Sequence, residues 1–224
     1  MARHLNRSHP SGAKTTVDLR GPYGAFRDNR PLRSTLVALL IVGAMLSLFA
    51  IILSLGIDAA SASLNNDKLG KILHMLAWAE HLTHLLIIVL FCFWINRACK
   101  NGWLLDAPKM KTTPARAVGN LFTPLLCLWK PLSTLGEIRN ASYGRQNVFS
   151  TLLPTWWVLL LATCIITISI SLLHRDGNSA ETLLIAQKLT TVSAPLTVIT
   201  DYLAIILILG ITHAQNKRLS LWRA

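Results

Sequence analysis

Four ionisable residues interrupt long apolar stretches of the sequence, where a charged group is costly. Glu80, His81 and His84 lie in one such stretch, and Asp201 lies in another. A charged group at the centre of a membrane span costs about 2.5–3.5 kcal/mol on insertion scales, so each of these residues is a functional candidate. In a helix of 3.6 residues per turn, His74, Glu80, His81 and His84 fall within one sector, which we expect to face other helices.

This buried polar cluster, Glu80, His81, His84 and Asp201, has three interpretations. Hydrogen bonds within it would join two membrane helices as a structural contact. Carboxylates and imidazoles at one depth are also the groups that proton and cation paths use in transporters. The third interpretation is a metal or haem site, because two imidazoles three residues apart share one side of a helix. Haem between two helices needs histidines at matching depths, and the other histidines lie near span ends, so we expect no metal or cofactor.

The same residues do not match the catalytic motifs that come nearest to them. His81 and His84 are three residues apart, whereas the protease motif His-Glu-x-x-His separates its histidines by four. One such pair is also too few for a di-iron desaturase, and the sequence has neither a phosphate-binding loop nor a readable nucleophilic triad. We therefore assign no catalytic residue, and an enzyme is the least favoured class.

Four apolar stretches are the elements that must position these side chains. They cover about 36–57, 72–95, 156–173 and 194–211. Each approaches or exceeds the roughly 20 residues that a helix needs to cross the hydrocarbon core. Backbone groups in lipid must be satisfied within the segment, so each stretch is predicted to be helical. We expect an all-α integral membrane four-helix bundle over residues 36–212.

Basic residues set the expected orientation, since the chain carries a net charge of +12. Seven Lys and Arg precede the first span and eight lie between the second and third, against two in each remaining loop. The positive-inside rule then places both termini and the segment between the second and third spans in the cytoplasm. Residues 1–35 are predicted to be a disordered basic tail, and 213–224 a second basic cytoplasmic tail. We expect this charge to meet anionic lipid headgroups, and we expect no nucleic-acid partner.

The segment at 97–147, between the second and third spans, contains an apolar run too short to cross the membrane. The run extends from Ala117 to Trp129, contains Pro124, and is bracketed by Arg116 and Lys130. We expect it to lie in the membrane interface or to re-enter the bilayer from the cytoplasmic side. An apolar repeat at helical spacing follows, which predicts a short amphipathic helix.

Ordered motifs run through this same region. They are Trp-x-x-Arg-Ala-x-x-Asn, a proline before Ala-Val-Gly, an aromatic-x-Pro, a Trp-x-Pro, and Glu-Ile before Ala-Ser. We call the following the motif residues: Trp94, Arg97, Asn101, Pro114, Pro124, Trp129, Pro131 and Glu137. The region resembles the signature of a bacterial membrane family, the domain-of-unknown-function family numbered 4328. The resemblance implies a four-helix membrane layout, and it implies no activity.

The motif residues have a structural interpretation and a partner-binding one. Proline and tryptophan at membrane boundaries usually set the direction and depth of the chain. We expect Asn101 to cap a helix end or turn, and Glu137 to pair with Arg97, Arg116 or Lys130.

These patterns favour a non-enzymatic scaffold or accessory protein. It would organise a membrane-protein partner, or further copies of itself, through the segment between the second and third spans. The alternative is a small transporter or a proton- or cation-linked channel that uses Glu80, His81, His84 and Asp201.

Overall fold

The computed structural model describes residues 20–60, 66–144, 150–176 and 180–223. Nearly all of them are helical, which confirms the all-α prediction. The four predicted apolar stretches lie within the long helices α1 (Arg30–Ala60), α2 (Asn66–Asp106), α5 (Leu152–Asp176) and α6 (Ala180–Arg223). Each of the four is long and apolar enough to cross a membrane.

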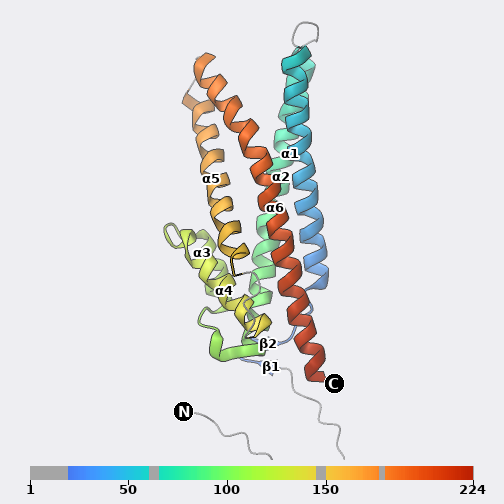
Figure 1. The fold of residues 1–224 in the computed structure, drawn as a ribbon, viewed down its shortest axis with the longest axis vertical. Coiled ribbons are helices and arrows are strands. Elements are labelled where there is room, and N and C mark those ends of the chain that lie inside the picture. The colour runs from blue at the N-terminus through green and yellow to red at the C-terminus, as the bar shows by residue number, and fades with distance from the viewer. Residues whose placement is uncertain (1–19, 61–65, 145–149, 177–179, 224) are drawn as a thin grey trace, which may run out of the picture.

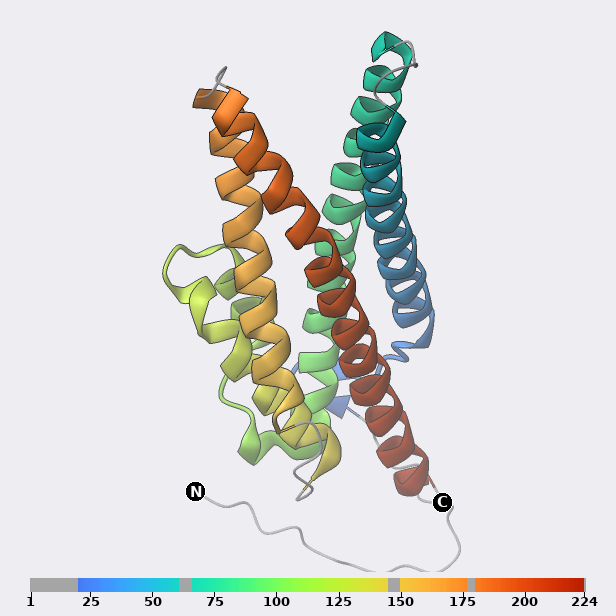
Figure 2. The same ribbon diagram turned by 45° about the horizontal axis from the view of Figure 1, so that its top comes forward.

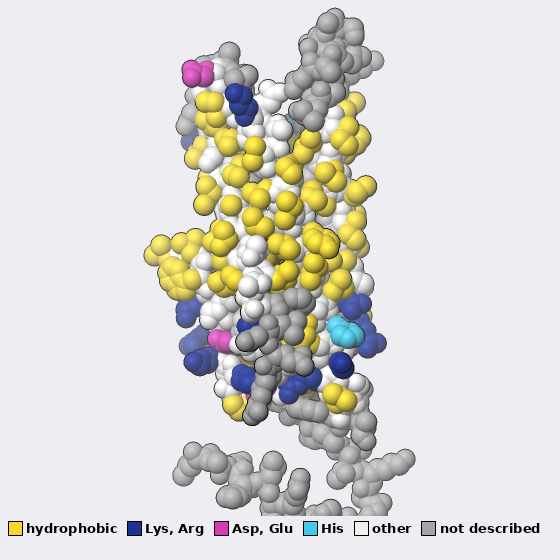
Figure 3. Space-filling view, viewed as in Figure 1, with side chains coloured by type: hydrophobic (Ala, Val, Ile, Leu, Met, Phe, Trp, Pro, Cys, Tyr) yellow, Lys and Arg dark blue, Asp and Glu magenta, His cyan; other side chains and the backbone are white. Residues whose placement is uncertain are grey.

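The long helices form two pairs, α1 with α2 and α5 with α6 (Figures 1 and 2). The pairs lie together at the end that contains α3, α4 and the C-terminal end of α6, and they diverge toward the opposite end. Helix α6 also contacts α1 and α2, so it connects the pairs. Lys and Arg side chains gather around the closed end, below an apolar belt (Figure 3). We call it the basic end.

Short elements build the basic end. They are the strands β1 (Arg20–Gly21) and β2 (Gly24–Ala25), the 3-10 helices η1 (Ala107–Lys109) and η2 (Leu126–Leu128), and the helices α3 (Pro114–Phe122) and α4 (Lys130–Tyr143). The strands pair antiparallel as a hairpin that contacts α2. Helix α4 is the predicted amphipathic helix, because Leu135, Ile138 and Ala141 are buried on one side of it.

Helix α2 extends further than the sequence pattern predicted. It has 41 residues, or about 60 Å at 1.5 Å per residue, which is about twice the hydrocarbon thickness. The predicted interfacial segment at 97–147 therefore begins as a continuation of the second span, through Asp106. Packing explains the difference: Ala98, Cys99, Asn101 and Leu105 are buried although the run looks polar.

Regular secondary structure extends into both predicted tails. Within 1–35, the hairpin and the start of α1 give residues 20–35 a defined structure, and Asn29 is only 1% exposed. The prediction of disorder is wrong for that part, and residues 1–19 lie outside the described residues. At the other terminus, α6 continues without a break to Arg223, so most of 213–224 is helix.

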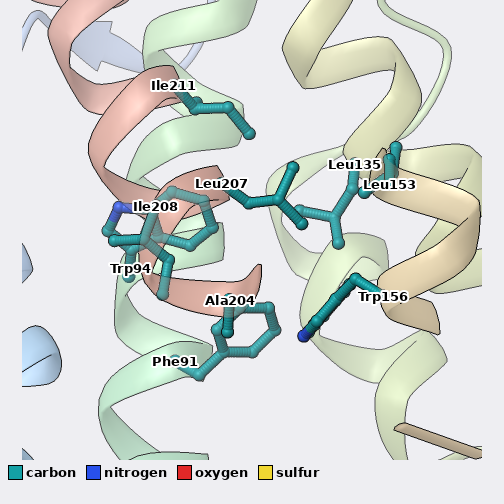
Figure 4. Close-up of a pocket in the computed structure, with 9 residues that line it drawn as sticks. All are labelled: Phe91, Trp94, Leu135, Leu153, Trp156, Ala204, Leu207, Ile208 and Ile211. Atoms are coloured by element: carbon teal, nitrogen blue, oxygen red, sulfur yellow. The ribbon is translucent and has the colours of Figure 1, made fainter. Parts of the chain in front are cut away.

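The main hydrophobic core lies toward the basic end, where α1, α2, α4, α5 and α6 meet. Figure 4 shows side chains from α2, α4, α5 and α6 converging on a cavity of about 10 Å³. Its lining residues are Phe91, Trp94, Leu135, Leu153, Trp156, Ala204, Leu207, Ile208 and Ile211. A cavity of this size is at the lower limit for holding one water molecule, so this junction is closely packed.

Replacing the fully buried Ile138 by alanine should lower the free energy of unfolding by about 2–5 kcal/mol, because apolar contacts are lost and a cavity remains. Tryptophan fluorescence during denaturant unfolding in detergent measures the change. Ser133→Ala, on the exposed side of the same helix, is the control and should change stability by less than about 0.5 kcal/mol. Equal effects of the two variants would contradict this packing of α4.

Candidate functional site

Two motif residues of α2 make buried hydrogen bonds to other elements. Trp94 Nε1 donates to Thr212 Oγ1 of α6 at 3.1 Å. Asn101 Nδ2 donates to the Arg27 carbonyl at 2.9 Å and to Gln215 Oε1 at 3.3 Å, and its Oδ1 accepts from the Arg27 N–H at 3.2 Å. Asn101 thus joins the N-terminal segment and α6 to α2, in place of the predicted cap of a helix end.

Gln215 is the centre of this network, and it was not among the predicted site residues. It is 1% exposed, and its Nε2 donates to the Ala98 carbonyl at 3.0 Å and to Ser142 Oγ at 3.2 Å. With the bond from Asn101, one side chain holds α2, α4 and α6 together. A helical repeat could have revealed it, because Leu207, Ile211 and Gln215 continue one buried side of α6 past the predicted end of the span.

Glu137 holds the turn that precedes α3. Its carboxylate accepts from the N–H groups of Lys111 at 2.9 Å and Thr112 at 2.8 Å, and from the Thr112 hydroxyl at 3.2 Å. The expected ion pair with a basic side chain is not formed within the described part of the chain: Arg97 instead donates to the Asp28 carbonyl at 3.3 Å. From α2, Trp103 Nε1 donates to the Thr112 carbonyl at 2.9 Å.

Three motif prolines lie at the boundaries of the short helices. Pro114 and Pro131 are buried in the first turns of α3 and α4. A backbone N–H in a first turn has no acceptor within its helix, so proline costs no helical hydrogen bond there. Thr113 caps α3, since its hydroxyl accepts from the Arg116 N–H at 3.4 Å. Pro124 is exposed in the turn after α3, directly before Leu125, which has a φ of 65°. That left-handed backbone is unfavourable for leucine, so this turn is strained.

The same turn exposes a group of large apolar side chains, which we call the tip: Phe122, Leu125, Leu128 and Trp129. Leu125 is 70% exposed. In Figure 3 an apolar bulge lies over this turn, level with the lower edge of the apolar belt and above a group of basic side chains. Trp157 of α5 anchors the turn by donating to the Leu128 carbonyl at 2.7 Å.

The structure divides the predicted buried polar cluster. Asp201 is buried, Glu80 and His84 are half-buried, and the Asp201 carboxyl interacts electrostatically with both. His81 and His74 are exposed on the outer side of α2, so the predicted sector was wider than the side that faces other helices. His81 Nδ1 bonds the Ala77 carbonyl at 2.5 Å. Within the described residues, no three His, Cys, Asp or Glu side chains are placed to hold a metal ion.

Four helices able to cross a membrane, with an apolar tip beside them, define the class: this is a membrane protein. The model of the family described as Domain of unknown function (DUF4328) matches residues 56–213, and the chain belongs to that family. No curated protein and no solved structure matches the chain. The family match begins near the end of α1 and stops before Gln215, so part of the network lies beyond it.

Replacing Asn101 and Gln215 by alanine, singly and together, tests whether they act as one unit. Each change leaves buried polar groups unpaired, so each alone should cost about 1–3 kcal/mol of unfolding free energy. Because the residues share a hydrogen bond, the double variant should lose less than the sum, with a coupling of about 0.5–3 kcal/mol. Unfolding in detergent measures all three, and strictly additive losses would contradict the network.

Proposed function

We propose that the protein is a non-enzymatic scaffold or accessory protein of the bacterial inner membrane. In this proposal the basic end presents α3, α4 and the tip to a partner. The main support is how the motif residues are used: Trp94, Asn101 and Glu137 direct their polar atoms to bonds within the chain. A catalytic acid, base or nucleophile must instead reach a substrate. The motif region is therefore better suited to holding a shape.

The bonds within the motif region hold an outward-facing surface in place. Leu125 and Trp129 project from a turn fixed to α5 by the Trp157 bond. Arg116 and Lys130, which flank the tip in the sequence, are exposed. An apolar tip between two basic side chains suits the boundary between acyl chains and anionic headgroups, where each Lys or Arg contributes on the order of 1 kcal/mol.

The proposed orientation puts the basic end and both termini in the cytoplasm. Its support is the excess of Lys and Arg before the first span and between the second and third, by the positive-inside rule. The tip would then lie in the inner leaflet, where anionic lipid is its expected contact. The partner we propose is another membrane protein, since it would approach the tip at the same depth.

Charge reversal at the tip tests this function. The double variant Arg116→Glu/Lys130→Glu alters only exposed side chains near the tip in the sequence, so the fold should be kept. Binding of anionic lipid and of the partner should be lost. Cross-linking in native membranes, purification and mass spectrometry would identify retained proteins, and native mass spectrometry would count bound anionic lipids. Lys188→Glu, exposed near the opposite end of α6, is the matched control and should retain both.

The result that contradicts the scaffold is an unchanged set of cross-linked proteins in the double variant at matched abundance. Capture of a second copy of this chain alone would replace the membrane-protein partner by self-association. A thermal unfolding midpoint equal to that of the wild type shows that any loss arises from the surface.

A further inference from the structure

A second polar site lies away from the basic-end network, between α1, α2 and α6. Asp201 of α6 is 8% exposed, and its Oδ2 is buried with no hydrogen-bond partner among the described residues. Leaving a buried carboxylate charged and unpaired is far costlier than neutralising it. The position therefore calls for a positive ligand or a proton.

Gly43 of α1 lies beside the Asp201 carboxyl, where an added Cβ would be in ordinary van der Waals contact. A Cβ added to Gly43 of α1 would lie 3.9 Å from Asp201 Oδ2 and 3.7 Å from the methyl group of Thr83 on α2. The unpartnered oxygen thus points to the contact between α1 and α2. One turn along α1, Ser47 is 2% exposed and donates to Glu80 Oε1 at 2.5 Å.

The ionisable groups that interact with Asp201 both come from α2. They are His84 and Glu80. Within their apolar stretches, 34–53 of α1 and 152–173 of α5 contain no charged residue. His84 donates its Nδ1–H to the Glu80 carbonyl at 2.9 Å, which leaves Nε2 as the ring nitrogen that can exchange a proton. Two carboxyl groups and one imidazole therefore act on one another electrostatically, and the apolar stretches around them contain no Lys or Arg.

We infer that Asp201 is a proton-binding site inside the membrane domain, with Glu80 and His84 as its exchange partners. In the resting form the proton is on Asp201, which removes the charge from the buried carboxyl. When Asp201 releases that proton, His84 Nε2 or the Glu80 carboxylate takes it, so an aspartate forms together with an imidazolium or a protonated glutamate. Such a site is independent of the scaffold surface at the basic end.

Labelling with dicyclohexylcarbodiimide tests this site in the full-length protein in native membranes. The reagent adds to a protonated carboxyl in apolar surroundings, takes up its proton, and rearranges to a stable N-acylurea that peptide mass spectrometry locates. We expect labelling of Asp201 that falls about tenfold for each pH unit on the alkaline side of its titration. Glu137, bonded at the basic end, should stay unlabelled and serves as the internal control.

Two variants complete the test. Asp201→Asn should lose the label. Gly43→Leu leaves the Asp201 carboxyl in place but sets a large side chain beside it, so this variant should lower labelling at least severalfold. Absence of label at Asp201 in the wild-type protein across the pH range would overturn the inference, and this result does not depend on a variant folding. Protection of Asp201 by added sodium ions would also overturn it, by assigning the site to sodium.

Discussion

The buried amide of Gln215 is the contact on which the basic end depends. It accepts from Asn101 of α2 and donates to the Ala98 carbonyl and to Ser142 of α4, all shielded from water. Removing one partner would leave polar atoms unpaired in a low-dielectric interior, so the network is stable only when complete. Because Asn101 also holds the Arg27 backbone, the N-terminal segment is bound by the same set of bonds.

The membrane explains why this network lies where it does. Lipid gives apolar helices little reason to associate, so polar contacts and close packing must hold them. Helices α2 and α6 are long enough to extend past the hydrocarbon, and their extensions carry Asn101 and Gln215. The helix pairs lie together at the end that contains α4 and the C-terminal end of α6 (Figure 1), and the network joins α4 and α6 to α2. Asp201 lies before Gln215 in α6, and its buried Oδ2 has no hydrogen-bond partner among the described residues.

The sequence was sufficient to predict the long helices, the amphipathic α4 and the family, because apolar length, period and motif order are local signals. It was insufficient where contacts between distant parts of the chain determine which residues are buried and which polar groups pair. Asn101 and Gln215 lie in stretches that look polar, and only their mutual burial makes them core residues. Glu137 has basic residues nearby in sequence, yet the backbone amides of Lys111 and Thr112 reach it first. His81 was misplaced because a broad sector of α2 was assigned to the interior.

Hydrogen–deuterium exchange of α4 in lipid nanodiscs tests most directly whether the basic end is one locked unit. A free helix of 14 residues is marginal in water and would exchange rapidly. If the Gln215 network holds α4 on α2 and α6, amides of Lys130–Tyr143 should be protected as strongly as those of α2 around Asn101. Rapid exchange throughout α4, with α2 still protected, would show that α4 is only loosely attached and would contradict the central role of the network.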